Sequence, residues 1–199
     1  MRRIAIINQK GGVPARWYLF GLAPLAVAFG AAGLSALMGE APVTPGTGLT
    51  GATLLSMLVF NTIQGATGEE LGWRGYALPN LQKRYSPLTA SIILGLVISG
   101  WHSVLHLVSP TGVPEWQFWI IMVSFCILIT WAYNHSGGSL LIVSLFHFAF
   151  NFSVELVVTR LGLISLETLF VIYLVVYGLS ALGVSVLGRM YKPLPSLSQ

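Results

Sequence analysis

The 199-residue chain is 55% hydrophobic and only 8% charged, which excludes an ordinary water-soluble domain, because such domains carry about 25% charged residues. Its length fits one domain, and the shortage of charge indicates a helical bundle whose solvent is lipid. The net charge of +4 does not indicate a nucleic-acid partner, because the ten Lys and Arg residues lie between apolar segments. The single cysteine, Cys126, excludes an intrachain disulfide and is interpreted as a buried packing thiol.

Residues 1–13 differ in character from the rest of the chain. They are similar to the opening strand and loop of partition-type ATPases, but Pro14, Ala15 and Arg16 stand where Gly-Lys-Thr would bind phosphate and Mg²⁺. The sequence therefore predicts no nucleotide site there, and a misassigned start or a fusion artefact is the favoured explanation. Residues 14–199 are predicted to form a single transmembrane domain.

Six apolar segments follow, each long enough or nearly long enough to cross a bilayer, which takes about 20 residues. They cover residues 17–38, 50–78, 88–108, 116–134, 139–158 and 165–188. Their uniform apolar character favours helices over the alternating strands of a membrane barrel, so we expect an all-α polytopic transmembrane bundle of about six helices. If all six cross, only Arg160 among the ten Lys and Arg residues falls on the side away from the termini. This asymmetry predicts an integral protein of the cytoplasmic membrane with both termini cytoplasmic.

The second segment ends in the stretch GEELGWRGYALP, residues 68–79, where Glu69, Glu70 and Arg74 stand in a chain with only six acidic residues. Ionisable groups at membrane depth are costly and usually mark a functional site. On a helix Glu70 and Arg74 lie one turn apart and can pair, whereas Glu69 points about 100° away. We therefore expect Glu69 to face a cavity as a candidate general base, with a solvated helix end as the simpler alternative.

Two later segments carry histidines. His102 and His106 form an HxxxH pair that could bind a metal by its spacing, although no Glu follows the first histidine as in zincins. His147 and Asn151 lie four residues apart and therefore on one helix face. A histidine can relay a proton, and an asparagine amide can donate to an oxyanion; a polar pair that joins two helices is the simpler alternative. From helix rise and tilt we expect these groups to meet the acidic cluster toward the cytoplasmic half of the membrane.

The order EExxxR, then tryptophan-histidine, then NxxGGSLLxxxxxHxxxN resembles the CPBP family of CAAX-processing and bacteriocin-processing (Abi) membrane peptidases, which are related to type II CAAX prenyl endopeptidases. The resemblance covers about residues 60–155, the catalytic core of that family. It implies an intramembrane endopeptidase in which Glu69 activates water and Asn151 helps to hold the oxyanion. The remaining motif positions fall on Glu70, Arg74, His102 and His147. Ile98 replaces the aromatic residue often found four positions before the second-motif histidine, and His106 has no counterpart.

The resemblance leaves the cofactor and the substrate open. A metalloprotease would use Zn²⁺ or another divalent metal, with Glu69, His102 and His147 as its candidate ligands, and a metal-free mechanism with a glutamate-activated water is the equal alternative. The expected partner is a peptide or membrane-protein substrate within the lipid bilayer, of CAAX type or a bacteriocin-like peptide. A non-catalytic membrane scaffold or bacteriocin self-immunity protein is the main alternative function, and a small transporter is another.

Overall fold

The computed structural model of the protein describes residues 12–43, 48–188 and 190–191, and for residues 64–66 it describes the backbone alone. The predicted atypical segment, residues 1–13, lies almost wholly outside the described residues. Every helix or strand assigned among the described residues is a helix. This confirms the all-α polytopic bundle expected from the composition.

The helices form six runs that match the six apolar segments to within a few residues. The first is α1 (Ala15–Leu37). The second is built from five consecutive pieces, α2 (Gly51–Phe60), η1 (Asn61–Glu69), α3 (Glu70–Gly72), η2 (Trp73–Ala77) and α4 (Leu78–Leu81), where η denotes the wider π-helix. The other runs are α5 (Pro87–Val108), α6 (Glu115–His135), α7 (Leu140–Val154) continued by η3 (Glu155–Arg160), and α8 (Leu166–Leu187).

Hydroxyl side chains fix where four of the runs begin. Thr50, Ser86, Ser139 and Ser165 each accept a hydrogen bond from the backbone N–H three residues later, which satisfies one of the free donors of a helix start. These residues belong to the turn-rich stretches that separate the apolar segments in the sequence. The local sequence therefore sets the boundaries of the helices, while their packing sets the site.

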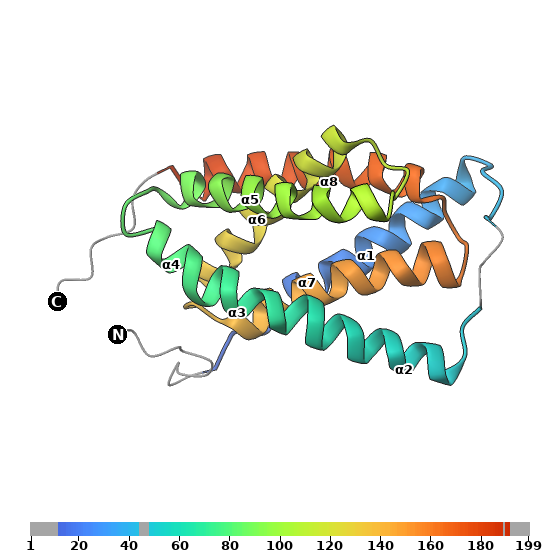
Figure 1. Ribbon diagram of the computed structural model, residues 1–199, viewed down its shortest axis with the longest axis horizontal. Helices are drawn as coiled ribbons and strands as arrows, with labels where there is room; N and C mark the ends of the chain where they lie inside the picture. The colour runs from blue at the N-terminus through green and yellow to red at the C-terminus, as the bar shows by residue number, and fades with distance from the viewer. Residues whose placement is uncertain (1–11, 44–47, 189, 192–199) are drawn as a thin grey trace.

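Five of the described helices are long and apolar enough to cross a membrane: Ala15–Leu37, Pro87–Val108, Glu115–His135, Leu140–Arg160 and Leu166–Leu187. The second run, which carries the polar cluster, is not one of these five. It nevertheless extends along the bundle beside the other helices (Figure 1). The polar run packs mainly against α7 and, through α4, against α5.

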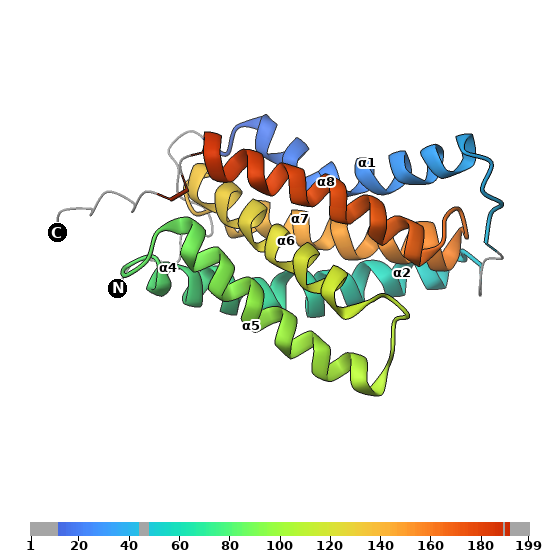
Figure 2. The ribbon, with the colours of Figure 1, turned by 90° about the horizontal axis from the view of Figure 1, so that it is seen from above.

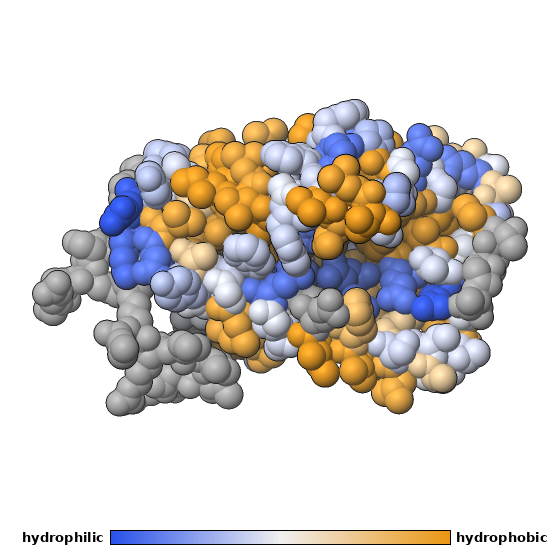
Figure 3. Space-filling view, viewed as in Figure 1, coloured by the Kyte–Doolittle hydropathy of each residue, from blue (hydrophilic) through white to orange (hydrophobic). Residues whose placement is uncertain are grey.

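The runs form two layers, which separate toward one end. Figures 1 and 2 show α5, α6 and α8 in one layer, and α7 with the second run in the other, while α1 packs along α7. In the first layer Gly95 brings α5 so close to α6 that a side chain there would meet the backbone of Val123. On the face that Figure 3 shows, apolar side chains cover much of both layers and a band of polar residues follows the recess between them.

At one end of the bundle the two layers are joined by apolar packing. At the turn from α4 to α5, Leu78, Ala90 and Leu94 form a buried cluster that joins the two layers. The start of α1 and the end of α8 lie at this same end, as expected when a chain traverses the bundle an even number of times (Figure 1). The orientation of these ends in the membrane stays a prediction.

Candidate active site

A cavity of about 440 Å³ lies between the two layers and collects the polar residues that the sequence singled out. Its wall is formed by the second run, α5, α6, α7 with η3, and the beginning of α8. Five of the six predicted site residues line it: Glu69, Arg74, His102, His147 and Asn151. The sixth, Glu70, is fully buried and holds two of these residues in place. Most of the remaining wall is apolar and aromatic, so the polar groups face a largely apolar cavity.

Glu70 is the structural centre of the site. Its Oε1 accepts a hydrogen bond from Arg74 Nη1 at 2.9 Å, which is the pair expected from the four-residue spacing. The same oxygen lies 2.7 Å from Nδ1 of His147 on α7. Among the described residues no donor reaches its other oxygen, Oε2. Glu70 thus ties the second run to α7 and orients a histidine of the cavity, while its own side chain is 1% exposed.

Glu69 occupies the position that the helix geometry predicted. It is the last residue of η1, it is half-buried, and its side chain lines the cavity while Glu70 points into the packing between the helices. No ion pair involving Glu69 occurs among the described residues, in contrast to Glu70. A carboxylate that faces a cavity and is not held in a close ion pair can take a proton from a bound molecule.

The backbone around the two glutamates is not a regular α-helix. The π-helical turns η1 and η2 stand on either side of the three-residue α3, so Glu69 and Arg74 both belong to widened turns. Such turns are rare and occur frequently at functional sites, because the extra residue re-aims the side chains beside it. The sequence pattern did not predict them.

Both cavity histidines use Nδ1 for a hydrogen bond to the protein. His102 Nδ1 lies 2.9 Å from the backbone carbonyl of Ile98, and His147 Nδ1 is bound to Glu70. Carbonyl and ion-paired carboxylate oxygens only accept hydrogen bonds, so the hydrogen is on Nδ1 in both rings. Nε2 is then the nitrogen of each ring that can meet a ligand.

The predicted metal ligands do not assemble into a metal centre in this arrangement. In the described part of the chain, no three His, Cys, Asp or Glu side chains are grouped as a metal ion would need. Glu69, His102 and His147 share the cavity wall, and Glu70 is already bound to both Arg74 and His147. The chemistry derived below therefore uses protein groups and water alone.

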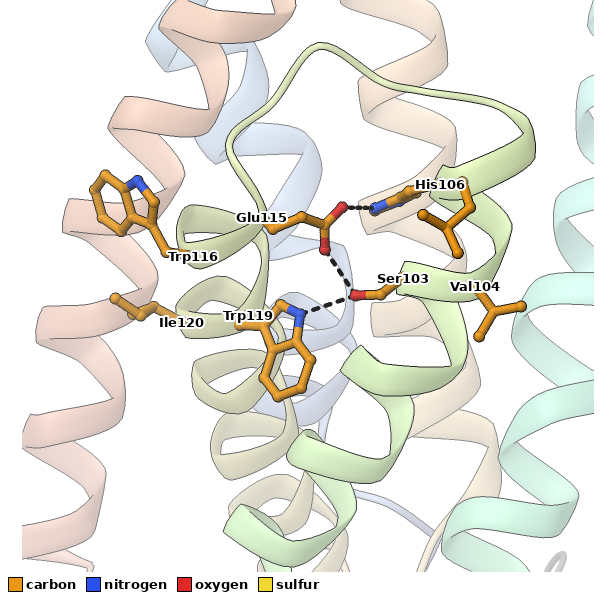
Figure 4. Close-up of a pocket in the computed structure, with 8 residues that line it drawn as sticks. Ser103, Val104, His106, Glu115, Trp116, Trp119 and Ile120 are labelled. Carbon is orange, nitrogen blue, oxygen red and sulfur yellow. Dashed lines mark hydrogen bonds and ion pairs between the residues drawn. The ribbon is translucent and has the colours of Figure 1, made fainter.

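His106, the other histidine of the HxxxH pair, lies outside this cavity. Figure 4 shows it in a separate groove between α5 and α6, where its Nδ1 is 2.7 Å from Glu115 Oε1. The second Glu115 oxygen accepts from Ser103, whose Oγ in turn accepts from the indole N–H of Trp119. The structure therefore separates the two histidines that the spacing could not tell apart.

Several residues of the site were not identified from the sequence. Arg74 Nη2 lies 3.2 Å from Sγ of Cys126, so this thiol, interpreted only as packing, contacts the buried ion pair. Phe125 packs edge-on against His147 and beneath the Arg74 guanidinium. Asn61 and Glu155 also line the cavity. For Glu155 a signal was present, because it follows Asn151 by four residues as Asn151 follows His147.

Comparison with known proteins agrees with the motifs. The model of a family described as type II CAAX prenyl endopeptidase, Rce1-like, matches residues 51–153, just over half of the chain. The chain is also 37% identical over 108 residues to CAAX prenyl protease 2 of Methanococcus maripaludis. That alignment covers 50% of this chain and 40% of the relative, so the chain spans less than half of the relative's length.

The family match spans every predicted site residue from Glu69 to Asn151, and the structure gathers those residues at one cavity of an all-helical bundle. Motif order, fold and sequence similarity therefore agree, and the chain belongs to the Rce1-like family of type II CAAX prenyl endopeptidases.

Proposed function

We propose that the protein is an intramembrane endopeptidase that hydrolyses a peptide bond with a water molecule activated by Glu69. One observation carries the proposal: an unpaired carboxylate, an asparagine amide and two oriented histidines line one cavity between apolar helices. Peptide hydrolysis needs a base, an oxyanion donor and exclusion of bulk water, and this wall offers all three.

In the first step the Glu69 carboxylate accepts a proton from water as the water oxygen attacks the peptide carbonyl. The new C–O bond turns the carbonyl oxygen into an oxyanion, to which the Asn151 amide donates a hydrogen bond. Nε2 of His102 or His147 can accept from the attacking water or, in a protonated ring, donate to the oxyanion. Arg74 and Glu70 act indirectly in this reaction, because they fix the ring of His147.

In the second step the C–N bond breaks. Protonated Glu69 returns its proton to the amine nitrogen, so the products are a carboxylic acid and an amine, and Glu69 is again a carboxylate. The same residue therefore serves as base and then as acid, which requires it to stay within reach of both the water and the leaving nitrogen.

The substrate is expected to reach the cavity through the recess between the layers. The walls carry Phe60, Phe118 and Phe170, which suit an apolar chain, and the recess faces the surroundings of the bundle (Figure 3). The relative's name, CAAX prenyl protease 2, makes a prenylated CAAX peptide the first substrate class to test. A bacteriocin-like peptide is the second class.

The test is cleavage of quenched fluorescent peptides by the purified protein in lipid, with prenylated CAAX peptides, their unprenylated forms and an unbiased library as separate arms. Glu69→Ala should abolish cleavage while the protein elutes and unfolds like the wild type. Glu40→Ala is the matched control, because Glu40 lies at the end of α1 outside the cavity and should leave the rate unchanged.

A chelator-treated sample examines the requirement for a metal separately. Cleavage that persists in Glu69→Ala would refute the role of this carboxylate. No cleavage by folded wild-type protein on any peptide would favour the scaffold or immunity function, and solute flux through liposomes without cleavage would favour a transporter.

A further inference from the structure

A second polar group lines the same cavity, away from the predicted catalytic residues. Glu155, the first residue of η3, has one carboxylate oxygen 2.8 Å from Arg160 Nη2 and the other 3.3 Å from the side-chain amide of Asn61. Asn61 begins η1, which packs beside α7 in the same layer, and its amide also donates to the Met57 carbonyl. Glu155 thus joins the second run to η3 on one side of the cavity.

The carboxylate of Glu155 stays accessible although it is held from two sides. Its side chain is 29% exposed, and its surroundings on the wall include the apolar side chains of Phe60, Val154 and Val158. An ionised carboxylate offers about four acceptor sites, of which the described contacts use two. Because Arg160 already balances its charge, the group best suited to the remaining sites is a neutral N–H donor.

The register of α7 places this acceptor at a defined distance from the reacting bond. Four residues separate Asn151 from Glu155, which is about 6 Å along a helix. An extended peptide advances about 3.3 Å per residue, so about 6 Å corresponds to two residues. If Asn151 holds the carbonyl that is attacked, Glu155 faces the peptide two residues away.

We propose that Glu155, held by Asn61 and Arg160, is a substrate-binding residue that accepts a hydrogen bond from a backbone N–H of the peptide two residues from the scissile bond. The inference rests on the proposed endopeptidase function and extends it. It explains how a site in a membrane aligns an extended chain, since main-chain hydrogen bonds position a peptide whatever its side chains are. Glu155 lies just beyond the residues matched by the family, 51–153.

The experiment removes one backbone N–H of the substrate at a time. The probe is the peptide that the wild type cleaves best in the library screen, together with depsipeptides in which an ester oxygen replaces a single amide nitrogen at each of the three residues on either side of the scissile bond. For the wild type, one ester at the second residue should lower kcat/KM by about 10- to 100-fold, as expected for a hydrogen bond to a charged acceptor. In Glu155→Ala and Glu155→Gln the same ester should have a much smaller effect.

The control is Glu115→Ala, which removes another ion-paired glutamate outside the cavity and should leave the wild-type ester profile intact. If Glu155 serves only to join η1 to η3, its variants will lower stability and cleave every peptide more slowly, but the ester effect will persist, and the inference is overturned. Cleavage of the all-amide peptide, which carries no ester, distinguishes failure of the endopeptidase proposal from failure of the Glu155 proposal. If the folded wild type does not cleave it, the endopeptidase proposal fails and this inference with it; normal cleavage with an unchanged ester profile refutes this inference alone.

Discussion

The molecule contains two Glu–His pairs with the same geometry and different surroundings. In the cavity, His147 Nδ1 lies 2.7 Å from Glu70 Oε1; in the groove between α5 and α6, His106 Nδ1 lies 2.7 Å from Glu115 Oε1. The Glu70 side chain is 1% exposed and the Glu115 side chain 51% exposed. The first pair also binds a buried arginine, and the second binds a serine near the helix ends.

This comparison shows that a short contact does not by itself make a functional site. A half-exposed pair is screened by its polar surroundings and contributes little to stability. Glu70 of the buried pair also depends on Arg74, and Arg74 on Glu70, because either charge alone in the apolar interior is strongly destabilising. Burial beside a cavity, rather than the distance of 2.7 Å, separates a site from a surface contact.

The largest effect is expected when the buried carboxylate is changed. Glu70→Gln keeps the shape of the side chain but leaves Arg74 buried without its counter-charge, so we expect a loss of about 3–5 kcal/mol in the free energy of unfolding, together with loss of cleavage. Unfolding in mixed micelles of increasing SDS content measures the free energy of unfolding, and the peptide assay measures cleavage. Glu115→Gln should change neither. Similar losses in both variants would break the comparison.

A smaller effect, on activity more than on stability, is expected for the histidines. His147→Ala removes an oriented ring from the cavity and should lower kcat by about 10²–10⁴-fold, the range for a group that transfers or stabilises a proton. His106→Ala should cleave like the wild type, because its ring faces a different groove. The measurement is kcat for both variants from steady-state kinetics under one set of conditions. A lowered kcat in His106→Ala would place this histidine in the reaction.

The smallest effect concerns the helix that contributes to both regions, since α5 carries His102 as well as His106. A Cβ at Gly95 would lie 2.8 Å from Val123 Cα, so Gly95→Ala must push α5 away from α6 and should lower the unfolding free energy by about 1–3 kcal/mol. Gly100→Ala is the matched control on the same helix, because nothing lies within 4 Å of a Cβ there. We expect equal or slightly greater stability for Gly100→Ala, because alanine has the higher helix propensity. A gain of stability in both variants would mean that helix propensity, not packing, dominates at Gly95 as well.

The sequence alone was sufficient for the fold class and for much of the site. The lengths of the apolar segments predicted the six helical runs, and the helical period predicted the Glu70–Arg74 pair and the cavity-facing Glu69. Segment length and helical period can both be read from the local sequence. The bond between Glu70 and His147 joins residues 77 positions apart, and no spacing rule tells which helices are neighbours. The π turns and the Arg74–Cys126 contact were missed for the same reason, since tertiary packing determines them.

The apolar plug formed by Leu78, Ala90 and Leu94 has a consequence for the cell. With the orientation that the basic residues predict, the plugged end faces the cytoplasm, while Thr111 and Thr159 line the cavity toward the other end. In that orientation, and with the proposed function, a substrate chain would have to enter the bilayer to reach Glu69, so the lipid itself would act as the first filter of substrates, ahead of any residue in the cavity.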